Sequence, residues 1–119
     1  MLTVLGLPKK RLGRGNVQQY FNNAHLKLKH CLFGRVKDLV AKYPNYKFAV
    51  SGHSLGGAIA SIAVYELVSE RYVSSDQIML YTYGMPRVGD KKYALDHDRT
   101  VPESWQLVHY TDFVPNFPK

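Results

Sequence analysis

The fold is decided by the stretch Tyr46-Lys47-Phe48-Ala49-Val50-Ser51-Gly52-His53-Ser54-Leu55-Gly56-Gly57. Residues 46–51 form a β-type run, and residues 58–65, which read Ala-Ile-Ala-Ser-Ile-Ala-Val-Tyr, form a helix-type run. Between the two runs the sequence fits the spacing G-x-S-x-G. A strand, a tight turn and a helix around this spacing are typical of a nucleophile elbow, a turn that exposes a reactive serine.

Ser54 is therefore the predicted nucleophile, held in a strained turn that lifts its hydroxyl clear of the sheet. Only glycine is expected to fit at Gly52 and Gly56, because a Cβ at either position would collide with the strand or the helix as the chain doubles back. The backbone N–H of Leu55 opens the following helix, and the partial positive charge of that helix end favours an oxyanion beside Ser54. The alternative is a glycine-rich connection in which the serine is idle.

Two further blocks lie downstream, Tyr81-Thr82-Tyr83-Gly84-Met85-Pro86-Arg87-Val88-Gly89-Asp90 and Val108-His109-Tyr110-Thr111-Asp112-Phe113-Val114-Pro115-Asn116-Phe117-Pro118. Together with residues 50–58, these blocks resemble the class 3 (fungal-type) lipases of the α/β-hydrolase fold. The resemblance covers about residues 17–118. It implies a hydrolase of lipid esters of the triacylglycerol type, with Asp112 as the acid that orients a catalytic histidine.

The pattern of apolar residues predicts a partial α/β fold of about three parallel strands with flanking helices. A long helix is expected from Asn16 as N-cap to just before Pro44, with a break or kink at Gly34. The expected strands cover residues 46–51, 77–83 and 105–110, with a helix at 55–72 and a short helix and loop within 88–101. Residues 1–15 are expected to be a flexible lead to a partial domain over residues 16–119.

The expected topology places Ser54 and Asp112 at the carboxyl edge of one sheet, where the sites of open α/β sheets lie. Ser54 precedes Asp112, as in the hydrolase order of serine, acid and histidine. An aspartate that only shapes the turn before Val114-Pro115 is the alternative.

A catalytic triad also needs an imidazole, which in this fold follows the acid. No histidine follows Asp112 in the sequence, and His109 is the nearest stand-in among the five histidines. We therefore expect an incomplete hydrolase, truncated at both ends, and an inactive fragment or pseudoenzyme is the alternative function.

The formal charge of +7 is placed unevenly along the 119 residues, since residues 1–47 hold ten Lys or Arg and the single acid Asp38. This half could meet an anionic lipid interface or a nucleic acid, but the lysines interleave with a helical apolar pattern and are better explained as a solvated face. No nucleic-acid partner is expected, and a binding module for anionic membranes or RNA is the remaining alternative function.

No cofactor is expected, because a serine hydrolase needs none and no metal-ligand spacing occurs. Cys31 is the single cysteine, which excludes an intrachain disulfide. The opening residues 1–7 have too short an apolar run for a signal peptide, and no segment has the length of a membrane span.

Overall fold

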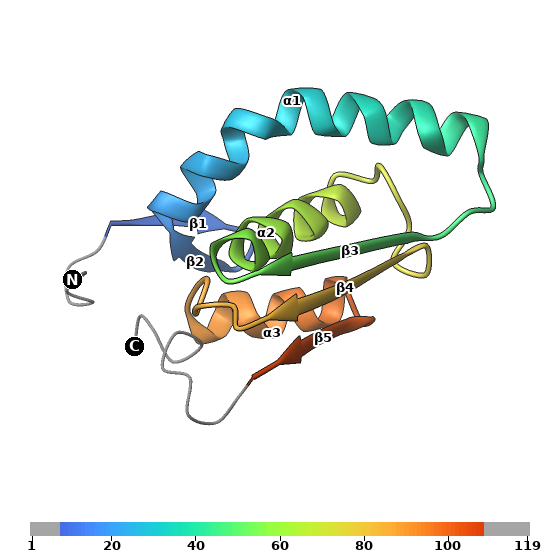
Figure 1. Ribbon diagram of the computed structural model, residues 1–119. Coiled ribbons are helices and arrows are strands. Elements are labelled where there is room, and N and C mark those ends of the chain that lie inside the picture. The colour runs from blue at the N-terminus through green and yellow to red at the C-terminus, as the bar shows by residue number, and fades with distance from the viewer. Residues whose placement is uncertain (1–7, 109–119) are drawn as a thin grey trace.

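The computed structural model describes residues 8–108 and contains a three-stranded parallel sheet with the strand order β3-β4-β5 (Figure 1). The strands are β3 (Phe48–His53), β4 (Ile78–Tyr83) and β5 (Ser104–Leu107). The helices are α1 (Gln19–Lys42), α2 (Leu55–Ser69) and α3 (Lys91–Thr100). This arrangement confirms the predicted partial α/β fold with three parallel strands.

The register of the sheet brings the carboxyl ends of β3 and β4 level with each other. Phe48 pairs with Ile78 at one end, and His53 pairs with Tyr83 at the other. Residue 54 therefore leaves the sheet directly beside the end of β4. This edge of the sheet is where a functional site is expected.

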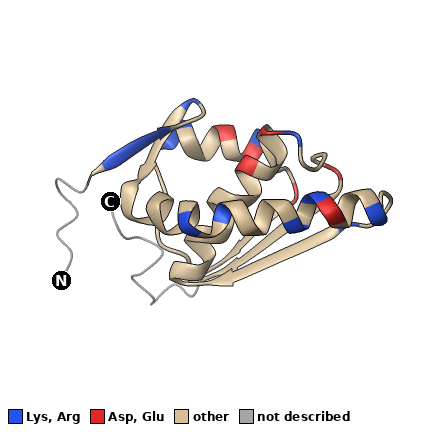
Figure 2. Ribbon diagram, turned by 90° about the horizontal axis from the view of Figure 1, so that it is seen from above, with Lys and Arg blue, Asp and Glu red and all other residues tan. Residues whose placement is uncertain are grey.

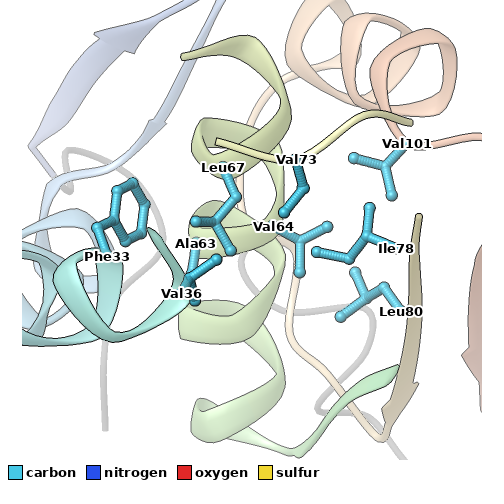
Figure 3. Packing of buried hydrophobic residues seen from close by; sticks show 9 residues of the cluster. All are labelled: Phe33, Val36, Ala63, Val64, Leu67, Val73, Ile78, Leu80 and Val101. Carbon is cyan, nitrogen blue, oxygen red and sulfur yellow. The ribbon is translucent and has the colours of Figure 1, made fainter. Parts of the chain in front are cut away.

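Helix α2 packs on β3 and β4, and α1 packs on α2 from outside (Figure 1). Between Gly57 and Leu67 every residue except Ile59 and Ala60 is buried, so α2 is covered on most of its circumference rather than along one stripe. In the main core, Phe33 and Val36 point from α1 toward α2 (Figure 3). The remaining members of this core cluster are Ala63, Val64, Leu67, Val73, Ile78, Leu80 and Val101.

The residues before α1 differ from the prediction. The predicted flexible lead covered residues 1–15, of which residues 1–7 lie outside the described part; from Lys9 on, the chain instead forms an antiparallel hairpin of β1 (Lys9–Leu12) and β2 (Gly15–Gln18). The two-residue connection begins at Gly13 with a φ of +58°, the conformation of the first central residue in a type II′ turn. Glycines and charges near a chain end were mistaken for flexibility, although Gly-X between two short runs is a hairpin signal.

The start of α1 also differs from the prediction. Asn16 was expected to cap the helix but belongs to β2, and its amide groups bind the Asp90 carboxylate instead. The helix begins at Gln19 and continues through Gly34 without the predicted break, ending at Lys42 shortly before Pro44. Gly34 lies on the exposed side of the helix, where the missing side chain costs no packing.

Candidate active site

Ser54 links the end of β3 to the start of α2 and has an unusual backbone conformation, with φ at 53° and ψ at −121°. Among residues 8–108, only Ser54 and Arg71 are non-glycine residues with a positive φ. Such a conformation costs on the order of 1–3 kcal/mol and persists only where the surrounding structure imposes it. The predicted strained turn is therefore present at the predicted serine.

Hydrogen bonds on both sides of Ser54 hold this conformation. Its N–H donates to the Tyr83 carbonyl at 2.9 Å, which ties the turn to the end of β4. Its carbonyl accepts from the N–H groups of Gly57 at 3.0 Å and Ala58 at 3.2 Å, which ties the turn to the first turn of α2. The serine is thus fixed between a strand and a helix that are themselves packed together.

The space around the turn explains one of the two elbow glycines but not the other. A Cβ at Gly52 would lie 2.5 Å from the Gly56 carbonyl oxygen and 2.7 Å from the Gly57 Cα. At Gly56, by contrast, a Cβ would have no neighbour within 4 Å in the described part of the chain. The predicted collision is confirmed for Gly52 and wrong for Gly56, because Gly56 faces outward on the first turn of α2. Gly57, which the prediction missed, faces Gly52 and Met85, with both 3.1 Å from an added Cβ.

Leu55 is the first residue of α2, and its side chain is exposed. Since Gly57 and Ala58 donate to the Ser54 carbonyl, the N–H groups of Leu55 and Gly56 are the ones that open the helix. An anion beside Ser54 would meet these amides and the positive end of the helix dipole. The oxyanion-hole role of Leu55 remains a prediction.

None of the histidines within residues 8–108 forms a hydrogen bond with Ser54. His25 is fully buried, and its Nε2 lies 3.1 Å from Glu66 Oε1; burial, and then the Lys29 charge, lower its pKa to about 4. His97 Nε2 lies 3.1 Å from the Ser61 carbonyl oxygen, and burial lowers the His97 pKa. His109 and Asp112 lie outside the described residues, so the role of Asp112 stays a prediction.

A hollow of about 400 Å³ is lined by residues of α3, β4 and β5 and of the segment between β4 and α3. Thr82, Tyr93 and His97 line it, and Ser54 does not. It is therefore separate from the elbow. Within residues 8–108, no group of three or more His, Cys, Asp or Glu side chains could hold a metal ion. None of the helices in this range combines the length and the hydrophobicity of a membrane span.

The sequence matches the family described as lipase (class 3) over residues 3–119. It is 37% identical over 108 residues to the lipase ZK262.3 of Caenorhabditis elegans, covering 89% of this chain and 30% of that protein. It is 38% identical over 103 residues to the lipase of Rhizomucor miehei, covering 86% of this chain and 28% of that protein. The chain therefore spans less than a third of the length of these curated relatives.

Solved lipase structures share the fold. The lipase of Rhizopus microsporus var. chinensis aligns with a TM-score of 0.88 and 32% identity, over 97% of this chain and 42% of that one. A triacylglycerol lipase whose catalytic centre is a serine protease triad aligns with a TM-score of 0.88 and 32% identity, over 96% of this chain and 44% of that one. The arrangement of β3, Ser54 and α2 is thus part of a fold that known lipases have.

Proposed function

This chain belongs to the class 3 lipase family, and we propose that it carries the nucleophile of a serine hydrolase that cleaves lipid esters. The observation that supports this most strongly is the backbone of Ser54, with its positive φ at the junction of β3 and α2. A serine that only joined a strand to a helix would not need this strained conformation. The energetic cost of this backbone conformation is explained if the turn presents the Ser54 hydroxyl to a substrate.

In the proposed reaction, Ser54 Oγ attacks the carbonyl carbon of the ester and gives its proton to a base. The carbonyl oxygen becomes an oxyanion, which the Leu55 N–H stabilises at the start of α2. The C–O bond to the alcohol then breaks, and the leaving oxygen takes up the proton, which leaves an acyl-serine. Water attacks the acyl-serine, releases the carboxylic acid and restores the hydroxyl of Ser54.

The base in this mechanism is a histidine outside residues 8–108, oriented by Asp112. His25 and His97 are poor candidates, since both are buried and engaged with other partners. The aspartate would hold the imidazole in the tautomer that accepts the serine proton and would stabilise the imidazolium that forms. No step in this reaction calls for a cofactor.

The substrate class we propose is acylglycerol. Relatives include a triacylglycerol lipase of Nicotiana tabacum, 39% identical over 92 residues, and a secreted mono- and diacylglycerol lipase of Penicillium cyclopium, 37% identical over 83 residues. The exposed side chain of Leu55 beside the nucleophile would suit a substrate with an apolar acyl chain.

The test compares Ser54→Ala with Ser51→Ala in the native protein. Ser51 lies on β3, the strand that leads to Ser54, but its side chain is on the exposed face, so its loss should leave activity unchanged. We expect Ser54→Ala to lower the hydrolysis of p-nitrophenyl esters and of emulsified triacylglycerol by several orders of magnitude. A fluorophosphonate should label Ser54 and no other serine, as seen in the mass of the modified peptide. A native protein with neither turnover nor labelling would overturn the proposal in favour of an inactive family member.

A further inference from the structure

Six exposed Lys and Arg side chains from two distant parts of the sequence lie along β1 and in the segment that leads into α3. We call this group the basic rim, and its members are Lys9, Lys10, Arg11, Arg87, Lys91 and Lys92. Lys10 pairs with Val17 across the hairpin, and Val17 in turn bridges to Gly89. The hairpin and residues 87–92 therefore form one continuous row. About 80 residues separate the two parts along the chain, so together their charges form no local run that sequence reasoning could detect.

Acidic side chains do not neutralise the basic rim. Among the described residues, no salt bridge involves any of its six members. Asp90 lies within the row, but its carboxylate accepts the N–H groups of Tyr93 at 2.9 Å and Asn16 at 3.1 Å. Burial opposes the ionisation of Asp90, yet these donors and the nearby Lys9 hold its pKa below the ordinary value. Six cations and one anion leave a charge of +5.

Two members of the basic rim lie at the start of a helix, where their charge does not stabilise the fold. Lys91 and Lys92 are the first two residues of α3, and the first turn of that helix contains no acidic residue. The N-terminus of a helix carries a partial positive charge, which repels cations within the first turn. The Asp90 carboxylate at the N-cap offsets part of this charge, so the fold tolerates the two lysines but gains nothing from their charge.

The basic rim lies at the end of the molecule toward which the carboxyl ends of the strands point (Figure 1). In Figure 1, the hairpin and the carboxyl ends of β3 and β4 occupy the same end of the molecule, and Figure 2 shows β1 as a strand of Lys and Arg at that end. The Tyr83 carbonyl accepts a hydrogen bond from the Ser54 N–H. Arg87 is only four residues after Tyr83, so the Cα atoms of Tyr83 and Arg87 are at most about 14 Å apart.

Apolar side chains are exposed at the same end of the molecule. Leu55 follows Ser54 and is 40% exposed, and Leu107 and Val108 at the end of β5 are 51% and 50% exposed. Cations beside aliphatic groups are the combination that binds the surface of an anionic lipid layer, with the charges at the head groups and the apolar groups at the acyl boundary. Nucleic acid would favour aromatic platforms beside the cations, and Tyr20 at the start of α1 and Tyr83 at the end of β4 are exposed, so single-stranded RNA is the competing partner in the test below.

We propose that the basic rim binds the surface of anionic lipid layers and turns the Ser54 edge toward them. The role of Ser54 at that surface rests on the proposed function, but the binding does not. Attraction of this kind contributes about 1 kcal/mol for each Lys or Arg near the surface and weakens as salt is added. Hydrolysis of lipid esters releases carboxylates, so the same attraction would hold the protein on a surface it had already begun to cleave.

Two variants with the same loss of charge test this proposal. The rim variant is Lys9→Gln, Lys10→Gln, Lys91→Gln and Lys92→Gln. Its control replaces four exposed lysines on α1 and just beyond it, Lys27, Lys37, Lys42 and Lys47, by Gln. Both are made with Ser54→Ala, so that no lipid is hydrolysed, and their flotation with vesicles of phosphatidylcholine alone or with phosphatidylserine is measured.

We expect the protein with its native charges to bind the phosphatidylserine vesicles only. The rim variant should lower the partition coefficient on the order of 1,000-fold, since it removes four charges. The control variant should stay within a few-fold of the native value. Equal losses in the two variants, equal binding to both kinds of vesicle, or a preference for a single-stranded RNA over the anionic vesicles would overturn the proposal. Turnover of a soluble p-nitrophenyl ester, measured with Ser54 in place, should be unchanged in the rim variant, which separates this inference from the proposed reaction.

Discussion

A Gly52→Ala substitution places a methyl group where the end of β3 passes the first residues of α2. The added Cβ would lie 2.5 Å from the Gly56 carbonyl oxygen, and 2.7 Å from the Gly56 carbonyl carbon and from the Gly57 Cα. All three neighbours are backbone atoms. No side chain can rotate away to make room, so the strand and the helix must move apart.

The expected cost follows from this geometry. Carbon atoms in contact prefer a separation of about 3.5–4.0 Å, so the overlap is about 1 Å. Overpacking commonly costs about 1–3 kcal/mol, and a backbone clash belongs at the upper end of this range. We therefore expect Gly52→Ala to lower the free energy of unfolding by about 3 kcal/mol. A displacement of Ser54 by about 1 Å should also lower kcat/KM about 100-fold.

Gly56→Ala is the matched control, because it adds the same methyl group two residues after the nucleophile instead of two before. Gly56 lies in the first turn of α2, with nothing within 4 Å of the added atom among residues 8–108. Alanine is favoured over glycine in a helix by about 0.5–1 kcal/mol, so this variant should be slightly more stable than the native protein.

Urea unfolding followed by circular dichroism, together with kcat/KM on a p-nitrophenyl ester, measures both variants. The reasoning predicts a difference of about 4 kcal/mol between Gly52→Ala and Gly56→Ala, the sum of these two effects. Equal destabilisation by the two substitutions would refute it, and would show that the two elbow glycines have equivalent steric roles.

Two further predictions concern polar groups outside the elbow. The pKa of His25 is about 4 in the folded protein and 6.5 in the unfolded chain. Neutral His25 therefore makes its full contribution to the free energy of unfolding above pH 6.5, and about 3 kcal/mol of stability is lost as the pH falls to 4 and below. His25→Gln keeps a donor but does not titrate; a stability difference from the native protein that stayed constant across this window would contradict the assignment. Asp90→Ala removes the cap of α3 and the link to Asn16 and should cost about 2–3 kcal/mol in urea unfolding, whereas Asp90→Asn should cost clearly less. Equal costs for the two Asp90 variants would show that the carboxylate has no special role there.

The sequence was sufficient to predict the elements whose signals are local. The β-type run before Ser54 and the helix-type run after it agree with β3 and α2, although β3 extends to His53 and α2 ends at Ser69. The parallel order of the strands also follows from alternation of strand and helix along the chain. The strained serine could be predicted because a particular spacing of small residues accompanies it.

Features that depend on distant contacts were not predictable in this way. The hairpin over residues 9–18 is ordered partly because Asn16 and Gln18 bond to Asp90 and Val88, which are 74 and 70 residues away. Similarly, the long helix was expected to present an apolar face to the core, yet it buries His25 against Glu66. Neither contact can be predicted from the neighbouring residues in the sequence.

Gly52 and Gly56 differ in their surroundings, although the sequence motif contains both. The spacing G-x-S-x-G treats both glycines alike, but only Gly52 faces the point where strand and helix touch. That contact is close because Ala58 and Ile62 hold α2 deep in the core, each fully buried. The strain at Ser54 is therefore sustained by the packing of the whole helix. Substitutions along the buried face of α2 should accordingly affect the nucleophile as well as stability, whereas exposed positions such as Gly56 should not.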